Sequence, residues 1–293
     1  MDDKDFLAER FEEHRVHLQR VSYRMLGSRS DADDAVQEAW IRLSRSDAGE
    51  VENLGGWLTT VVARVCLNML RSRRTRREQP FGGHVPDPIV SRADDSDPEH
   101  EALLADSVAL ALLIVLETLS PAERLAFVLH DMFAVPFDEI AAMVERTPEA
   151  TRQLASRARR RVRGGVPTPD PDRTRQREVV DAFHAAARDG ELERLVALLH
   201  PDVVLRVDFG PAAPIPFREL SGARVVAEQA ATYGRFPGVS REVLVNGAAG
   251  YVRFRDGKPF SVVGYIVADA KIAAIDILAD PVRLARLDLS ALD

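Results

Sequence analysis

The chain has 293 residues, with 39 Lys and Arg against 46 Asp and Glu, and a formal net charge of −7. Its length suits two or three domains of ordinary size. The single cysteine, Cys66, excludes an internal disulfide and a cysteine-rich zinc site. The longest apolar run, 108–116, is too short to span a bilayer, and the acidic N-terminus lacks the layout of a secretory signal. We therefore expect a cytoplasmic protein without membrane span, metal or cofactor, with Cys66 packed as an inert thiol.

Residues 1–79 are predicted to form three helices, because apolar residues recur in them at helical spacing. These residues are Leu7, Phe11, Leu18, Val21 and Met25, then Ala32, Val36, Ala39, Trp40 and Leu43, then Trp57, Val61, Val65, Leu67 and Leu70. Ser30 or Asp31 is the expected N-cap of the second helix, 31–45. The third helix, 53–74, ends in arginines, which suit the negative end of a helix dipole.

Two segments rich in proline and glycine are predicted to join folded parts of the chain. Residues 80–102 also carry many aspartates and show no helical or strand period, so we interpret them as a linker. Residues 166–172 form a shorter joint, which we interpret as a hinge. The expected folded parts are therefore 1–79, 103–165 and 173–293.

Residues 103–165 end in a strongly basic helix, with seven arginines and one acid between Arg146 and Arg163. Two shorter helical segments and a tight turn precede it, which is the layout of a helix-turn-helix motif, whose second helix enters the major groove of DNA. Thr147 is the expected N-cap of the basic helix, and the turn before it holds Glu145 where glycine is more usual. A solvated helix that binds nothing, or one that pairs with the acidic linker, stays an alternative.

The outward face of the basic helix carries side chains that can bind DNA. They are Glu149, Arg152, Gln153, Ser156, Arg157 and Arg160. Arginine and glutamine can read guanine and adenine edges, and the later arginines would bind phosphates. The face expected to be buried consists of Thr151, Leu154, Ala155, Ala158 and Val162.

Residues 173–293 begin with two helical patterns and continue with strands, which predicts an α+β domain. Asp256-Gly257 and Asp269-Ala270 are expected hairpin turns. The charges balance, sixteen basic to sixteen acidic, so this part is not expected to hold DNA. Candidates for chemistry are His184, His200, Asp208, Tyr265 and Asp276. Their spacing in the sequence does not identify an acid–base pair. Asp276 lies on an apolar strand face, where burial could raise its pKa.

A resemblance to bacterial sigma factors runs through residues 6–163. Region 2 of these proteins is similar to SDADDAVQEAWIRLSR (30–45) followed by GGWLTTVVARVCLNMLRSRRTRRE (55–78), and region 4 is similar to LETLSPAERLAFVLHDMFAVPFDEIAAMVERTPEATRQLASRARRRV (116–162). Having only these two regions, in this order and spacing, is typical of the extracytoplasmic-function group. Residues 173–293 resemble SnoaL-like domains, of the nuclear-transport-factor-2-like (NTF2-like) cone fold. That combination is typical of the subgroup that includes sigma factor J.

The resemblance implies contacts between the linker and the C-terminal domain. The subgroup's linker motif, tryptophan-leucine-proline-glutamate-proline, is similar to HVPDPI at 84–89, and its asparagine-proline-aspartate-lysine-leucine motif is similar to ADPVRL at 279–284. A third motif, an aspartate followed by three glycines, keeps only Asp208 and Gly210. The implied regulatory contacts are Pro86, Asp87, Pro88, Asp208, Asp280, Pro281 and Arg283.

The resemblance also implies how the helices bind their partners, core RNA polymerase (β and β′ subunits) and promoter DNA. The helix 31–45 would dock on the β′ clamp, through Asp33, Asp34, Gln37, Glu38 and Trp40. The helix 53–74 would hold the −10 element, through Asn68, Arg71, Arg73, Arg74, Arg76 and Arg77. The outward face of the basic helix would read the −35 element.

We therefore expect an alternative sigma factor that directs promoter-specific transcription initiation and is not an enzyme. Its SnoaL-like domain would modulate it in cis by contacting the linker and setting how far regions 2 and 4 spread, so that no separate anti-sigma protein is required. Our hypothesis is that the domain restrains an inactive arrangement and that 279–284 helps activation. The alternative is a DNA-tethered protein whose C-terminal domain senses a small ligand or catalyses a reaction.

Overall fold

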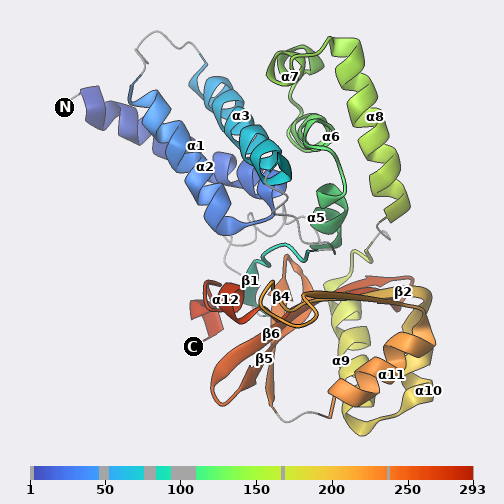
Figure 1. Cartoon of the computed structure of the whole chain (residues 1–293). Coiled ribbons are helices and arrows are strands. Elements are labelled where there is room, and N and C mark those ends of the chain that lie inside the picture. Colours follow the sequence, from blue (N-terminus) through green and yellow to red (C-terminus); the bar gives the residue numbers. More distant parts are fainter. Residues whose placement is uncertain are drawn as a thin grey trace. The chain divides into compact units, whose positions relative to one another are not determined.

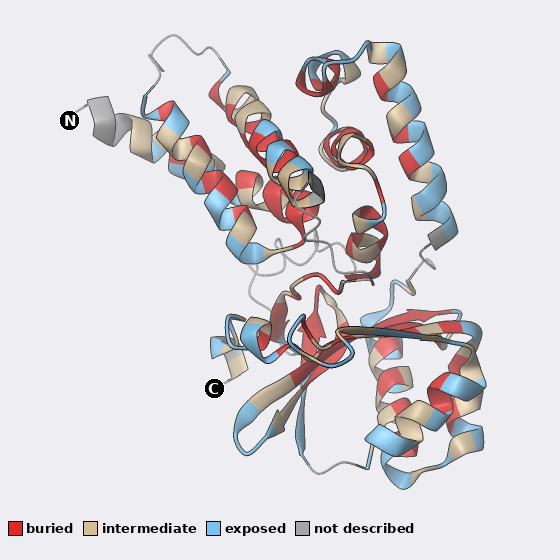
Figure 2. Ribbon diagram, in the orientation of Figure 1, coloured by how far each residue is buried: buried red, intermediate tan, exposed pale blue. Residues whose placement is uncertain are grey.

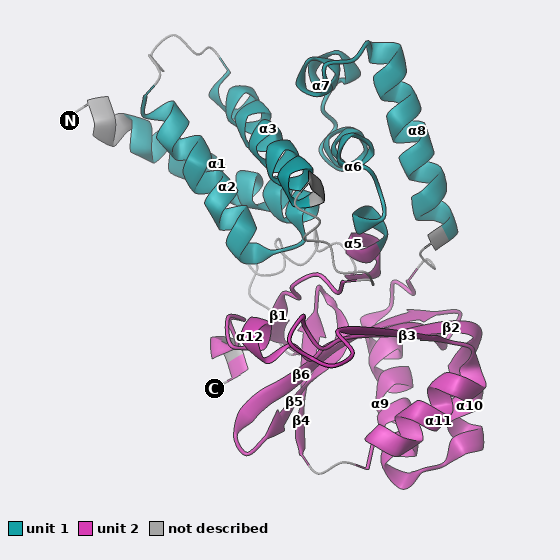
Figure 3. Cartoon of the chain, in the orientation of Figure 1, with its two compact units in different colours: residues 1–79, 115–165 teal, residues 80–114, 166–293 magenta. Residues whose placement is uncertain are grey.

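The chain divides into two compact units, residues 1–79 with 115–165 and residues 80–114 with 166–293 (Figure 3). The computed structural model describes residues 3–45, 53–75, 84–93, 110–165, 169–235 and 238–292. The expected boundaries at 79, at 102–103 and at 166 lie outside the described residues. The described linker residues group with the C-terminal unit.

Helices α1 (Asp3–Leu26), α2 (Arg29–Leu43) and α3 (Leu54–Thr75) form the N-terminal part of the first unit (Figure 1). Each of them packs against the other two. The prediction for the start of α2 was wrong: Ser28 is its N-cap, because its Oγ accepts the Asp31 N–H at 3.4 Å. The three helices of this part were therefore predicted from their apolar spacing, with small errors at their ends.

The buried face of α3 differs from the expected one. Leu58 and Val62 are completely buried, whereas Trp57 and Val61 are only half-buried. Both pairs repeat at helical spacing, so the sequence contains two adjacent apolar stripes. Packing against the other helices determines which stripe is buried. Cys66 lies on the buried side, where burial raises the pKa of its thiol to about 12, which confirms a packed, unreactive cysteine.

The second part of this unit is the predicted helix-turn-helix. Helix α5 (Leu110–Glu117) crosses the boundary between the two units, and the elements that follow it are α6 (Pro121–Phe127), the π-helix η2 (Val128–Met132), α7 (Phe137–Val144) and α8 (Pro148–Gly165). Ser120 and Glu123 form a capping box at the start of α6. Glu145 ends α7 in the left-handed conformation, with φ 56°, which explains why glycine is more usual there. The expected inner face of α8 is confirmed, with Thr151 and Ala158 completely buried.

Arg124 joins the two parts of the first unit. Its side chain is 3% exposed, and its Nε donates to the carbonyl oxygen of Arg24 at the end of α1, at 3.2 Å. Burial lowers the pKa of Arg124 to about 10, although the carboxylate of Glu117, 4.0 Å away, favours its charge. The helix-turn-helix therefore packs on the N-terminal helices in this structure through a buried cation.

The described part of the second unit is built around a mixed sheet with strand order β1-β4-β5-β6-β7-β2-β3 (Figure 1). The strands are β1 (Val90–Arg92), β2 (Leu199–Asp208), β3 (Phe217–Ser221), β4 (Val239–Val245), β5 (Ala248–Arg255), β6 (Lys258–Ala268) and β7 (Lys271–Leu278). β2 and β7 are parallel, and the other neighbours are antiparallel. The helices of this unit are α9 (Arg173–Asp189), α10 (Leu192–Leu198), α11 (Ala223–Tyr233), α12 (Pro281–Leu284) and the 3₁₀-helix η3 (Ser290–Leu292).

Helices α9, α10 and α11 cover one face of the sheet, and the main core of the unit lies between them (Figure 2). Its largest buried members include Phe183, Tyr251 and Tyr265. The expected α+β fold is thus confirmed. The sequence reasoning missed β3 and α11, since neither was recognised between residues 210 and 238.

The two predicted hairpin turns are confirmed by their backbone. Asp256 and Gly257 have φ of 52° and 73°, and Asp269 and Ala270 have φ of 51° and 57°. Positive φ at both central residues is the geometry of tight hairpins that follow the twist of the strands. Asn246 and Gly247 form a third such turn. No helix among the described residues is long and apolar enough to cross a membrane.

Candidate functional sites: the linker contacts and the DNA-binding face

Arg283, in the short helix α12, connects the linker to the C-terminal domain. Its Nε donates to Asp87 Oδ1 at 2.7 Å, its Nη1 to Asp208 Oδ2 at 2.8 Å, and its Nη2 to the carbonyl oxygen of Val85 at 2.5 Å. The guanidinium is planar and offers donors on two edges, so it can bind three acceptors at once. We call His84, Val85, Asp87, Asp208 and Arg283 the Arg283 cluster.

Asp208, at the end of β2, is the buried anion of the Arg283 cluster. Its side chain is 6% exposed, and it also accepts the backbone N–H of Val85 at 3.1 Å and of Gly210 at 3.0 Å. Burial alone would raise the pKa of Asp208, but hydrogen bonds from His84 and Val85 and the charge of Arg283 lower it below its ordinary value. Asp208 is therefore ionised at neutral pH and fully partnered.

Two backbone features shape this cluster. Gly210 has φ 80°, and a Cβ there would lie 2.4 Å from the carboxyl carbon of Asp280, so only glycine fits. Asp280 is the N-cap of α12, where its Oδ1 accepts the Val282 N–H at 2.9 Å, and Pro281 follows in the first turn. Asp280 and Pro281 therefore begin the helix that carries Arg283.

The linker continues from the Arg283 cluster into the sheet. Val85, Pro86 and Pro88 are buried. Ile89 then exchanges two hydrogen bonds with Asn246, whose Oδ1 accepts the Ile89 N–H at 3.0 Å and whose own N–H donates to the Ile89 carbonyl at 2.8 Å. Residues 90–92 follow as β1, antiparallel to β4.

The interpretation of 80–102 as a segment without strand structure was therefore wrong for residues 90–92. The strand is only three residues long and its partner lies about 150 residues away in the sequence, so no local pattern marks it. The predicted residues Asp87, Asp208 and Arg283 do come together. The sequence reasoning missed the contributions of His84 and Val85 and of the hairpin residue Asn246.

The predicted DNA-binding face of α8 is exposed along its length. Glu149, Arg152, Gln153, Ser156, Arg157 and Arg160 all lie on the outside of the unit. Arg152 lies over the ring of Phe137, 5.7 Å from its centre, and 3.4 Å from Glu149 Oε1. Arg159, on the side, is paired with Asp131 at 2.5 Å. The helix thus presents a continuous polar face, with Arg159 engaged outside it.

The predicted polymerase-binding face of α2 is only partly free. Asp33, Asp34 and Gln37 are exposed, but Asp33 Oδ1 accepts the Nε2 of Gln19 at 3.0 Å, and Glu38 accepts the Nε of Arg42 at 2.9 Å. Trp40 is half-buried, with its ring 5.1 Å from that of Phe11.

The predicted −10 residues lie near the end of α3, where Asn68 and Arg71 are exposed. Arg73 donates to the carboxylate of Asp31 and to the carbonyl oxygen of Leu26, so it links α3 to the first turn of α2 and to the end of α1. Only the backbone of Arg74 is described, and Arg76 and Arg77 lie outside the described residues.

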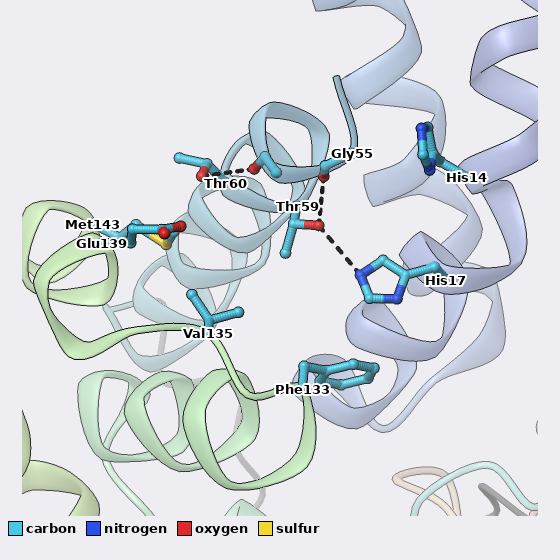
Figure 4. Close-up of a pocket in the computed structure, with 10 residues that line it drawn as sticks. His14, His17, Gly55, Thr59, Thr60, Phe133, Val135, Glu139 and Met143 are labelled. Atoms are coloured by element: carbon cyan, nitrogen blue, oxygen red, sulfur yellow. Dashed lines mark hydrogen bonds between the residues drawn. The ribbon is translucent and has the colours of Figure 1, made fainter. Parts of the chain in front are cut away.

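A pocket of about 310 Å³ lies in the first unit, between the N-terminal helices and the helix-turn-helix (Figure 4). Its walls include His14 and His17 of α1, Thr59 of α3, Phe133 and Glu139. The Thr59 hydroxyl donates to the carbonyl oxygen of Gly55 at 2.7 Å and lies 3.2 Å from His17 Nε2. Because these polar groups are already hydrogen-bonded, we assign the pocket no ligand.

Two of the candidates for chemistry in the C-terminal domain, His184 and Tyr265, meet inside the core. His184 Nε2 is 2.7 Å from the Tyr265 hydroxyl inside the core, where burial and the charges of nearby arginines lower the pKa of His184 to about 3. Asp276 is buried on the other face of the sheet, 3.1 Å from Arg206, and burial raises the pKa of Asp276 to about 6. His200 only accepts the backbone N–H of Asp202, at 3.1 Å. The direction of the Asp276 pKa shift is the one expected from the sequence.

Comparison with protein families defines the class of protein first. Residues 10–76 match the model of sigma-70 region 2, and residues 109–162 match that of sigma-70 region 4. These ranges correspond to the N-terminal helices and to the helix-turn-helix described above. The chain is therefore of the sigma-70 class, with regions 2 and 4.

Individual relatives define the family more closely. The chain is 40% identical over 274 residues to the ECF RNA polymerase sigma factor SigJ of Mycobacterium tuberculosis, covering 91% of this chain and 86% of that protein. It is 38% identical over 211 residues to the probable ECF sigma factor SigI of the same species, covering 71% and 72%. The crystal structure of M. tuberculosis SigJ aligns with a TM-score of 0.75 and 34% identity, over 98% of this chain and all of that one. The chain belongs to the extracytoplasmic-function (ECF) RNA polymerase sigma factors.

Membership of this family establishes the general function. Sigma factors are transcription initiation factors and not enzymes; they bind core RNA polymerase and promoter DNA. The chain is thus an ECF sigma factor that directs transcription initiation, and an α+β domain follows its two sigma regions.

Proposed function

We propose that the C-terminal SnoaL-like domain modulates this sigma factor in cis through the linker between regions 2 and 4. The observation that carries the proposal is the Arg283 cluster, in which one half-buried guanidinium binds both the linker and the end of β2. A linker held at 84–92 has less freedom than a loose chain, so holding it limits how far the two DNA-binding regions can separate. A separate anti-sigma protein is not required for such control.

The proposal assigns two opposing effects to the domain. The domain as a whole restrains an inactive arrangement of regions 2 and 4, while the segment 279–284, by holding the linker through Arg283, favours the active one. The hinge supports the idea of a close attachment, since Asp170 donates its N–H to the Val267 carbonyl at 2.8 Å and accepts the Ala270 N–H at 3.1 Å. A short attachment keeps the domain at high effective concentration beside the regions it controls.

The partners are assigned by surface. We propose that the exposed acids of α2, Asp33 and Asp34, bind the β′ clamp of core polymerase, with β as the second subunit contacted. The end of α3, with Asn68 and Arg71, would bind the −10 element, and the outward face of α8 would read the −35 element. Exposure of these residues supports the assignment. The action takes place in the cytoplasm, with promoter DNA.

The Arg283→Ala variant tests the linker proposal. Removing the guanidinium takes the cationic partner from the buried Asp208. It also removes the hydrogen-bond donors to Asp87 and Val85, so the linker should detach from the domain more often. We expect the backbone N–H groups of Val85 and Ile89 to exchange with solvent at least about 10-fold faster, the scale of one lost charged hydrogen bond. Promoter-specific transcription with core polymerase should fall.

Arg286→Ala is the matched control, because it removes an exposed arginine three residues along the chain. It should change neither the exchange rates nor the transcript yield. Unchanged exchange at Val85 and Ile89 in Arg283→Ala would show that the cluster does not hold the linker. Faster exchange with unchanged transcription would show that the linker contact has no regulatory role.

A further inference from the structure

Glu123 is a buried carboxylate whose partners exceed what a helix cap needs. It lies at the third position of α6 with 6% exposure. Its Oε2 accepts the backbone N–H of Ser120 at 3.1 Å and the Ser120 hydroxyl at 2.8 Å, which completes the capping box. The same carboxylate also binds two arginines of α8: Oε1 accepts Arg157 Nε at 3.1 Å, and Oε2 accepts Arg161 Nη1 at 3.2 Å.

The geometry of the Arg157 contact leaves its DNA-binding end outward. The bond to Glu123 uses Nε, on the inner edge of the guanidinium, while the side chain remains 46% exposed. The terminal nitrogens of an arginine are those that bind a guanine edge or a phosphate in pairs. Because the guanidinium is planar, a bond at Nε also sets the plane in which those nitrogens lie.

The surroundings keep this carboxylate charged. Burial alone would raise the pKa of Glu123, but the hydrogen bonds from Ser120 and Arg157 and the charge of Arg161 lower it below its ordinary value. Arg161 thus offsets the cost of burying the carboxylate, while Arg157 is the partner on the predicted DNA-binding face.

We propose that Glu123 is a positioning residue for promoter recognition, which orients Arg157 toward the −35 duplex before DNA is bound. The proposal rests on the assignment of α8 to the −35 element. A long side chain that is already ordered loses less conformational entropy on binding, so the affinity of the specific complex rises. The negative charge beside α8 also weakens attraction to phosphates in general, which lowers non-specific binding. Both effects raise the ratio of specific to non-specific affinity.

The experiment uses holoenzyme made from core RNA polymerase and the full chain. The probe is a promoter fragment that the wild-type holoenzyme selects from a random-sequence library, and the competitor is the same fragment with its −35 element scrambled. The measured quantity is the ratio of the two affinities. In Glu123→Gln, whose amide oxygen can still accept the Ser120 N–H, we expect this ratio to fall roughly 10-fold, the scale of one hydrogen bond to a charged group.

Two control variants separate positioning from helix structure. Asp131→Asn makes the same acid-to-amide change opposite Arg159, off the predicted face, and should change the ratio by less than about 2-fold, as expected for a partly exposed pair. Ser120→Ala removes the cap hydroxyl without removing the carboxylate; it should lower the melting temperature but leave the ratio unchanged. A ratio that falls in Ser120→Ala as much as in Glu123→Gln would assign the effect to the cap and overturn the proposal.

Combining Glu123→Gln with Arg157→Ala identifies the residue through which Glu123 acts. Arg157→Ala alone should lower the ratio, and adding Glu123→Gln should lower it little further, because coupled residues are not additive. If Arg157→Ala lowers the ratio but Glu123→Gln does not, the positioning role fails while the DNA assignment stands. If Arg157→Ala itself leaves the ratio unchanged, the assignment of Arg157 to DNA fails, and the proposal with it.

Discussion

At the scale of single residues, the buried carboxylates Asp208 and Asp276 of the C-terminal domain are each paired with an arginine. Asp208 is held by Arg283 and two backbone N–H groups, and Asp276 is held by Arg206. Burying a charge without a partner would cost several kcal/mol. Each of these two carboxylates is thus engaged in an ion pair, which is a structural role.

His184 makes the free energy of unfolding of the domain depend on pH, and its lowered pKa fixes the direction of that dependence. Its pKa falls to about 3 in the folded protein, from an ordinary 6.5, because it is buried near arginines. The unfolded chain therefore binds the proton more readily, and the free energy of unfolding falls by about 1.4 kcal/mol per pH unit as the pH drops from 6.5 toward 3. At pH 5 the wild type should have lost about 2 kcal/mol from this source.

The His184→Gln variant tests this value, since glutamine keeps a hydrogen bond to Tyr265 but does not titrate. Its stability should fall less between pH 7.5 and pH 5, as measured by hydrogen exchange of the core strands β5 and β6. Asp276, with its raised pKa, acts in the opposite direction between about pH 4 and 6, but it is present in both proteins and cancels. Equal pH profiles for the two proteins would contradict a neutral, buried His184.

At the scale of elements, the turn of the helix-turn-helix carries backbone strain. Glu145 has φ 56° and ψ 49°, a conformation that costs a residue with a Cβ roughly 1 kcal/mol. We expect Glu145→Gly to stabilise the first unit by about 1 kcal/mol and to raise the melting temperature by a few degrees. The control is Glu139→Gly, inside α7, which should destabilise by a similar amount. A lower melting temperature for Glu145→Gly would show that the glutamate side chain has a stabilising role that outweighs the strain.

Elements with a local signal were predictable, and those made by distant pairing were not. The helices α6, α7 and α8 can be predicted from their apolar spacing. Ser120-Pro121 and Thr147-Pro148 also mark the starts of α6 and α8. The turns at Asp256-Gly257 and Asp269-Ala270 are similarly local. By contrast, β1 exists because β4 offers an edge to the linker, and the choice between the two stripes of α3 depends on which neighbours pack against it.

The same distinction holds for the sites. The outward face of α8 follows from helical periodicity once its buried face is known, so the exposure of Arg152 and Arg157 was predictable. The meeting of Asp87, Asp208 and Arg283 was implied by resemblance to the sigma factor J subgroup, because these residues lie far apart in the sequence. Glu123 carried no functional signal, since its residue type and position are those of an ordinary capping box.

At the scale of the whole molecule, the charge distribution agrees with a protein that binds DNA as part of a larger enzyme. The chain carries a net charge of −7 although α8 is rich in arginine. Non-specific affinity for DNA comes mainly from phosphate contacts. A low free affinity for DNA is therefore expected, and it fits our proposal that the linker controls the two DNA-binding regions.

The most direct test of this account is run-off transcription with core RNA polymerase, comparing the full chain with a truncation after Pro167. We expect both to give promoter-specific transcripts that depend on the added protein, with a higher yield from the truncation, because it lacks the domain that restrains the inactive arrangement. Arg283→Ala, with the opposite sign, should give less transcript than the full chain. Equal yields from the full chain and the truncation would contradict control in cis by the C-terminal domain.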